Sequence, residues 1–294
     1  MGAISKFLTS NIAYIIWFVI YFSIAWVISW AVSGNMLYSF IFVAVIYGIS
    51  ITIALSPIGE IILRLLQNCR EPSTESERSY LLPLFEEVYE NAIEIDPNLN
   101  RGIKLYIMDD MYINAFAMGR KTIAVTMGAM TTWTKEELKG VLAHEFGHMS
   151  YGHTKALLLS TIGNIFFYLI VWAFKVILGI VEFLANVFAH FNVLGIAFSI
   201  ILFVTRLYVN ILIFLFVNLG EIILALNSRS NEIEADTFAY EVGYGRELIS
   251  GLYLLQKTTM NTKVGIMEQL KASHPHMADR IAHLERLENE NIEE

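Results

Sequence analysis

The chain has 294 residues, of which 55% are hydrophobic and 16% are charged, against about 25% charged in an average soluble domain. A mean hydropathy of +0.53 indicates a protein that is partly solvated by lipid. The net charge of −8 argues against a nucleic-acid partner, since phosphate binding needs clustered Lys and Arg. The single cysteine, Cys69, excludes an internal disulfide and a zinc site built from cysteines.

Two uncharged runs at the start of the chain predict a transmembrane hairpin. Residues 12–32 and 36–55 carry no charge, and each is as long as the helix of about 20 residues that crosses a bilayer. Ser33-Gly34-Asn35 separates the runs as a polar turn, and Ser56-Pro57 closes the second. We assign residues 1–57 to this hairpin.

Residues 58–152 are more polar and predict the first half of a globular α+β part. A 3.6-residue apolar period predicts a helix over residues 79–95, with Pro83 near its first turn, where a missing N–H costs little. Alternating residues predict strands at residues 103–108, 114–118 and 122–126. The last two flank Gly119-Arg120-Lys121 as a β-hairpin.

A further helix has clear signals at both ends. Thr134 and Glu137 have the spacing of a capping box, in which each side chain satisfies a backbone N–H of the first turn. Gly152 is a typical stop, so the helix is expected to end near Tyr151.

A second membrane section is expected at residues 153–220. Residues 156–174 form the third uncharged run, and Lys175 and Glu182 interrupt the apolar stretch that follows. Residues 194–219 form the fourth candidate span, with Arg206 near its middle. A charge at that depth is costly and usually faces protein or water.

Residues 221–294 return to polar, mainly helical sequence and form the second half of the globular part. The loop between the first two spans has no Lys or Arg, whereas Arg64, Arg70 and Arg78 follow the second span. Positive charge favours the cytoplasmic side, so both termini and both polar sections are expected there.

The chemistry centres on an H-E-x-x-H motif in the capped helix, at His144, Glu145 and His148. Helix positions i and i+4 share a face, so both imidazoles can reach one metal ion. Glu145 can take a proton from a metal-bound water and pass it to a leaving amine. Imidazole and carboxylate ligands suit zinc, which needs no redox chemistry. The alternative is a chance match on an amphipathic helix.

A catalytic zinc ion needs a third protein ligand and one open position. The longer metzincin pattern requires Gly and His where this chain has Tyr151 and Thr154, so that class is excluded. His153 is one residue out of register and is expected to be a cap or a surface residue. Glu232 and Asp236 share a helix face, so one can bind the metal while the other orients a histidine. Glu234 is expected to be solvated, and plain surface charge remains the alternative for all three.

With these motifs, the sequence resembles the membrane gluzincin family that contains the bacterial HtpX proteases and the CAAX prenyl proteases. Four blocks carry the resemblance, in the family's order: Asn114-Ala115-Phe116-Ala117 with Val125-Thr126; His144 to His148; Ser228-Arg229 with Glu232 and Ala235-Asp236; and His274-Pro275 with Arg280-Ile281. They extend from about residue 103 to residue 284. Chain length and the two pairs of spans are most similar to the HtpX branch.

The resemblance implies roles that spacing alone leaves open. Glu232 becomes the third zinc ligand, and Asp236 supports a ligating histidine. His274 becomes a donor to the tetrahedral oxyanion, a role in which a donor has a large effect. The strand formed by Asn114, Ala115, Phe116 and Ala117 becomes the edge that pairs with an extended substrate, and Arg280 orders this region or the substrate backbone.

The sequence therefore predicts an α+β membrane protein, mainly α, with four transmembrane helices and a cytoplasmic zincin-type domain that contains a small β-sheet. The expected activity is that of a zinc metalloendopeptidase with one Zn²⁺ per chain, in the cell (plasma or inner) membrane. Its substrates are expected to be damaged, misassembled or regulatory membrane proteins, by analogy with the family. An inactive metal-binding membrane scaffold and a small metal transporter are the rival interpretations.

Overall fold

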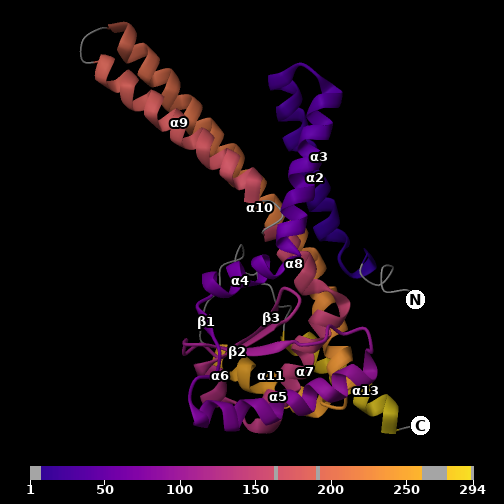
Figure 1. Ribbon diagram of the computed structural model, residues 1–294. Helices are drawn as coiled ribbons and strands as arrows, with labels where there is room; N and C mark the ends of the chain where they lie inside the picture. The colour runs from indigo at the N-terminus through magenta and orange to yellow at the C-terminus, as the bar shows by residue number, and fades with distance from the viewer. Residues whose placement is uncertain (1–7, 162–164, 190–192, 260–276, 293–294) are drawn as a thin grey trace.

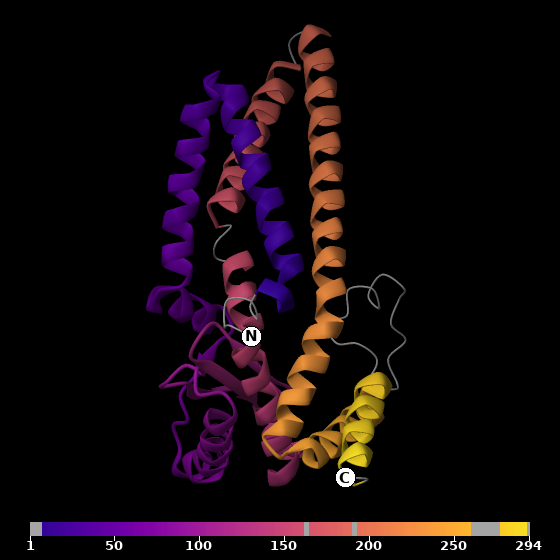
Figure 2. The ribbon, with the colours of Figure 1, turned by 90° about the vertical axis from the view of Figure 1, so that its right-hand side faces the viewer.

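We analysed a computed structural model of the chain, which describes residues 8–161, 165–189, 193–259 and 277–292. Figures 1 and 2 show two helical hairpins above a lower part that contains the β-sheet and that we name the polar part. The hairpins lean apart in the view of Figure 1. The described residues contain four helices long and apolar enough to cross a membrane. The prediction of a mainly helical α+β membrane protein is thus confirmed.

The first hairpin agrees with the predicted boundaries to within one residue, as α2 (Ile12–Ser33) and α3 (Met36–Ala54). Gly34 lies between them with a φ of 69°, which glycine adopts without the steric cost a side chain brings. Trp17 of α2 stacks on Phe216, with ring centroids 4.8 Å apart. This contact joins the first hairpin to the second near the polar part.

The third span is displaced from its predicted position. The chain forms α8 (His153–Thr161) and then α9 (Ile165–Ala189), and the window able to cross a membrane is residues 171–188 rather than 156–174. This window includes Lys175 and Glu182. The Arg206 guanidinium lies 2.7 Å from the Glu182 carboxylate, so two charges that each oppose insertion are paired within the second hairpin.

The fourth span continues without a break into the polar part. Helix α10 (Val193–Glu241) has 49 residues, and its first part, residues 194–220, is the membrane candidate. Its C-terminal part carries Glu232 and Asp236, so one helix connects the bilayer to these two carboxylates.

The helix predicted at residues 79–95 begins earlier, as α5 (Glu75–Ile95). Its start is a second capping box, in which Glu77 N–H donates to Thr74 Oγ1 and Thr74 N–H donates to the Glu77 carboxylate. Pro83 therefore lies inside the helix rather than in its first turn. It is tolerated on the exposed side, where water can satisfy the carbonyl of Ser79 that Pro83 cannot pair.

A mixed four-stranded sheet has the order β1-β2-β4-β3. Its strands are β1 (Cys69–Arg70), β2 (Lys104–Met108), β3 (Ala115–Met118) and β4 (Thr122–Thr126). Strands β2 and β4 are parallel, and β3 and β4 form the predicted antiparallel hairpin. Strand β3 lies at the edge of the sheet and carries the segment expected to bind substrate.

The remaining described elements of the polar part are five helices. They are α4 (Pro57–Leu66), α6 (Met127–Thr132), α7 (Lys135–Tyr151), α11 (Gly245–Thr259) and α13 (Met277–Ile292). Helix α7 has the predicted bounds, with the Thr134–Glu137 capping box and Gly152 at its end. It contacts α5, α10, α11 and β3, so the H-E-x-x-H helix is the centre of the polar part.

Gly147, within the motif, sets how closely α7 approaches α10. A Cβ atom at this position would lie 2.8 Å from the Cα of Ala235, well inside normal contact. We expect Gly147→Ala to push the helices apart, with a destabilisation of about 1–3 kcal/mol and weaker metal binding. Thermal unfolding and metal titration measure both effects. Gly179→Ala is the matched control, because its Cβ would meet nothing within 4 Å, and equal effects in the two variants would contradict this account.

Candidate metal centre

Three potential ligands from α7 and α10 converge at the interface of these helices. His144 Nε2 and His148 Nε2 are 3.1 Å apart. Glu232 places Oε2 3.5 Å from the first nitrogen and Oε1 3.4 Å from the second. Ligand atoms around a tetrahedral zinc ion, with bonds of about 2.0–2.1 Å, lie about 3.3 Å apart. The donor types and their spacing therefore fit a zinc ion.

Asp236 and Arg280 support this cluster from behind. Asp236 Oδ1 lies 2.9 Å from His144 Nδ1, a geometry that holds the proton on Nδ1 and leaves Nε2 free to bind metal. The Arg280 guanidinium donates to both oxygens of Asp236 at 2.6 and 2.8 Å, and its Nη1 is 2.8 Å from Glu232 Oε2. Asp236 is fully buried and Arg280 is 4% exposed, so these charges are balanced within the protein.

This arrangement moves the histidine pKa values in opposite directions. Burial and the nearby charge of Arg280 lower the pKa of His144, but its hydrogen bonds to Asp236 and Glu232 outweigh them and raise the pKa to about 9. Burial lowers the pKa of His148 to about 4. Burial raises the pKa of Asp236, and the opposing charge and hydrogen bonds of Arg280, together with His144, bring it to about 2. In the metal-free site at neutral pH, His144 is therefore protonated on both ring nitrogens, whereas His148 is neutral.

Glu145 connects the cluster to the edge strand. Glu145 is 7% exposed, and its Oε2 accepts the backbone N–H of Ala117 at 2.6 Å. In β3, Phe116 pairs with Ala124 and Ala117 with Ile123. The N–H of Ala117 is thus directed away from β4 and toward the motif helix. A carboxylate able to carry protons lies beside the backbone of the strand expected to bind substrate.

His153 and Glu234 contribute contacts that the sequence did not indicate. His153 is 5% exposed rather than a surface residue, and its Nδ1 is 2.9 Å from His148 Nδ1. Glu234 Oε2 lies 3.1 Å from His153 Nε2, so Glu234 is a partner of this ring rather than a solvated charge. Burial lowers the pKa of His153. A neutral His153 can accept the Nδ1 proton of His148 and donate its own to Glu234, which leaves His148 Nε2 free to bind metal.

His274, expected as an oxyanion donor, lies outside the described residues. Asn114 precedes β3, where its carbonyl accepts the N–H of Thr126 at 3.0 Å. Ala115, Phe116 and Ala117 lie within β3, at the sheet edge that faces α7.

Comparison with known proteins finds relatives that are named as proteases. Protease HtpX of Alcanivorax borkumensis is 28% identical over 243 residues, which cover 75% of this chain and 74% of that protein. Protease HtpX of Hahella chejuensis is 30% identical over 191 residues, or 58% of this chain and 61% of that protein. Among solved structures, S. mikatae Ste24p aligns with a TM-score of 0.46 and 22% identity, over 96% of this chain and 64% of that chain.

A sequence model of the family described as peptidase family M48 matches residues 83–288. This range includes β3, the H-E-x-x-H motif of α7 and the carboxylates of α10. Because the match covers more than half of the chain, this protein belongs to peptidase family M48.

Proposed function

We propose that this chain is a zinc-dependent endopeptidase of the membrane, with His144, His148 and Glu232 as ligands of one zinc ion. The observation that carries the proposal is the convergence of these three residues, with their ligand atoms within 4.8 Å of one another. The distances between these ligand atoms are similar to those around a tetrahedral zinc ion, which supports the choice of metal. Relatives named Protease HtpX support the choice of reaction.

Glu145 is the proposed general base and acid. A bound zinc ion would supply Lewis acidity and a water of lowered pKa. Glu145 Oε2 would accept the proton of that water and later deliver it to the amine that leaves the cleaved peptide bond. The Ala117 N–H holds this carboxylate in place, so the base is already oriented before substrate enters.

The edge strand is the proposed substrate platform. An extended peptide can add to β3 as a further strand, through the backbone groups of Ala115 and the carbonyl of Ala117 on the side away from β4, since the Ala117 N–H already donates to Glu145. The peptide would then run past Glu145, whose carboxylate contacts Ala117. We assign His274 to the oxyanion. We assign Arg280 to the ordering of Asp236 and Glu232, because its guanidinium contacts both carboxylates.

We further propose that the substrates are misfolded, damaged or regulatory membrane proteins, and that the polar part lies on the cytoplasmic side of the cell (inner) membrane. Two observations support this: the described residues contain four membrane-capable helices, and Arg64, Arg70 and Arg78 follow the second span. The proposed role is quality control of that membrane.

The direct test is proteolysis of an unfolded reporter protein by the detergent-purified chain. Cleavage that is lost on chelation and recovered on addition of zinc is expected. A protein that binds zinc but cleaves no reporter would instead indicate a metal-binding scaffold. Zinc uptake into vesicles that contain the protein would indicate a transporter.

Zinc binding should release one proton from the site under mildly acidic conditions. With the pKa of His144 near 9 and that of His148 near 4, only His144 is protonated at pH 5.5, and metal must displace that proton. Apparent zinc affinity should then rise tenfold per pH unit. Two imidazoles with the ordinary pKa of about 6.5 would together release nearly two protons. Calorimetry in buffers of different ionisation enthalpy counts the protons, and a value near two would contradict the shifts.

A further inference from the structure

Helix α4 presents an apolar face that no described part of the chain covers. It begins at Pro57, directly after α3 ends at Ala54, and lies across the base of the membrane hairpin in Figure 1. Ile58, Ile61 and Leu65 follow the i, i+3, i+7 spacing of one helix face and are 57%, 46% and 71% exposed. An exposed apolar face on a helix that directly follows a membrane helix is typical of a helix that lies in the membrane interface.

The opposite side of α4 is fastened to the sheet. Glu60 is 7% exposed, and its carboxylate accepts the backbone N–H groups of Arg120 and Lys121 in the β3–β4 turn. It also accepts the Thr122 hydroxyl at 3.0 Å. These bonds use the negative charge of Glu60 to hold the turn against α4, so the helix has a fixed orientation, with its apolar face outward.

A pocket of about 400 Å³ opens beside this helix, between the end of α3, α4 and the sheet. Its lining includes four cations and one anion: Arg64, Lys104, Arg120, Lys121 and Glu60. Lys104 has a partner in Glu71 at 3.5 Å, but both side chains are 66% exposed, and such a pair is weak. The pocket therefore has a positive surplus on a chain whose net charge is −8.

Two of the cations are held in place. Arg64 lies 5.0 Å from the centre of the Tyr106 ring and donates to the Thr122 hydroxyl at 3.2 Å. Arg120 donates to the carbonyl of Leu55, at the end of α3, at 3.1 Å. Guanidinium groups fixed in this way lose little conformational freedom when they bind an oxyanion.

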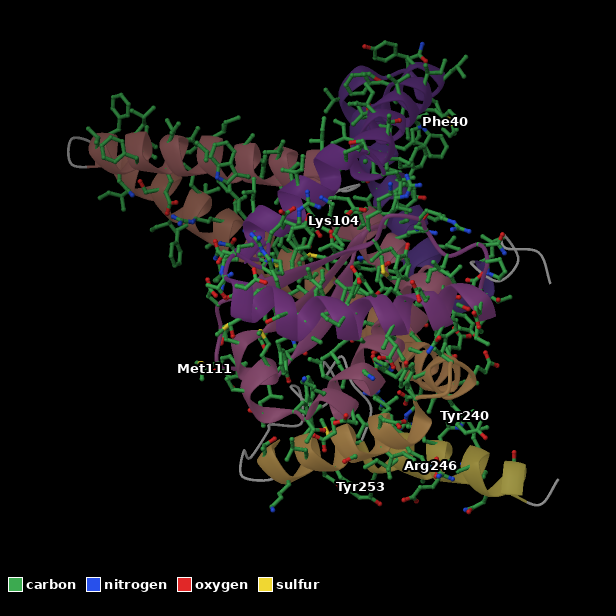
Figure 3. All side chains as sticks on the ribbon, turned by 60° about the horizontal axis from the view of Figure 1, so that its bottom comes forward. Phe40, Lys104, Met111, Tyr240, Arg246 and Tyr253 are labelled. Carbon is green, nitrogen blue, oxygen red and sulfur yellow. The ribbon has the colours of Figure 1, made fainter. Side chains whose placement is uncertain are left out.

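We propose that this pocket binds the phosphate of an anionic phospholipid headgroup, while the apolar face of α4 contacts the acyl chains of the same leaflet. Position and charge both support a lipid. The pocket adjoins the end of a membrane helix, and Figure 3 shows Lys104 on the side nearer the membrane hairpins, away from Tyr240, Arg246 and Tyr253. Cations at a bilayer surface attract anionic lipids.

The test measures lipid binding by native mass spectrometry of the full chain in detergent, with phosphatidylglycerol or phosphatidylcholine added. Wild type should bind the anionic lipid more tightly. The pocket variant Lys104→Gln/Lys121→Gln should lose about 30-fold in affinity for it, the factor for two cations at a surface. Both lysines are exposed, so the fold is retained. Ile61→Ser/Leu65→Ser should also weaken binding, with no loss of thermal stability.

The matched control is Arg246→Gln/Lys257→Gln, which removes two exposed cations of α11 and should leave lipid binding unchanged. An equal loss in the two double variants, or equal affinity of wild type for the two lipids, would overturn the proposal. Inorganic phosphate is the last arm of the test. If it displaces phosphatidylglycerol at equal concentration, the pocket is a site for free phosphate and the lipid assignment is wrong.

Discussion

Glu145→Gln is expected to reduce reporter cleavage by about 10²–10⁴-fold while zinc still binds. A positioned general base contributes about 10²–10⁴-fold, and Glu145 is the proposed proton carrier without being a ligand. The glutamine oxygen can still accept the Ala117 N–H that Glu145 Oε2 accepts at 2.6 Å. The local structure should therefore survive. Single-turnover cleavage and zinc content, measured on the same preparation, separate the two effects.

Glu136→Gln is the matched control, because Glu136 lies on the same helix, α7, and is exposed. It should retain full activity. Cleavage by Glu145→Gln at the wild-type rate would show that another group moves the proton. Loss of zinc together with activity would show that Glu145 holds the metal, and the proposed ligand set would then be wrong.

The parts of the fold that the sequence predicted depend on residues close together in the chain. The Thr134–Glu137 capping box and Gly152 gave both ends of α7 correctly, because cap hydrogen bonds join residues within one turn. The uncharged runs of α2 and α3 and the turn between β3 and β4 have the same local character. The second capping box, at Thr74 and Glu77, is an equally local signal, and it begins α5 at Glu75, earlier than the predicted start at residue 79.

The errors occurred where a distant residue decides the outcome. The third span is predicted to end before Lys175 and Glu182, yet both lie inside it, and Glu182 is paired with Arg206, 24 positions away, on the adjacent helix. The hydropathy of the residues around Glu182 contains no information on its partner Arg206. His153 was expected at the surface, but it is buried between His148 and Glu234, and Glu234 is 81 positions away. Spacing could show that Glu232 and Asp236 share a helix face, but it could not show which contact His144 makes.

Glu232→Gln should weaken zinc binding by at least about 100-fold, the largest effect expected on α10. Loss of a residue that supports a ligand costs about 10–100-fold, and Glu232 is the proposed ligand itself. Glu234→Gln, two residues away, should cost about tenfold or less, because Glu234 contacts His153, which in turn contacts the ligand His148. Glu241→Gln, exposed on the same helix, should have no effect. Competition with a chelator of known affinity measures all three.

The order of these effects matters more than their size, because Glu232 is also 2.8 Å from Arg280. Removing its charge leaves Arg280 buried with Asp236 as its remaining carboxylate partner among the described contacts, which lowers stability as well as affinity. Thermal unfolding in excess chelator measures this stability cost separately from zinc binding. The difference between wild type and Glu232→Gln should be no larger in chelator than with zinc present. If Glu234→Gln weakens zinc binding more than Glu232→Gln does, the third ligand has been assigned to the wrong carboxylate, and Glu234 would be the next candidate.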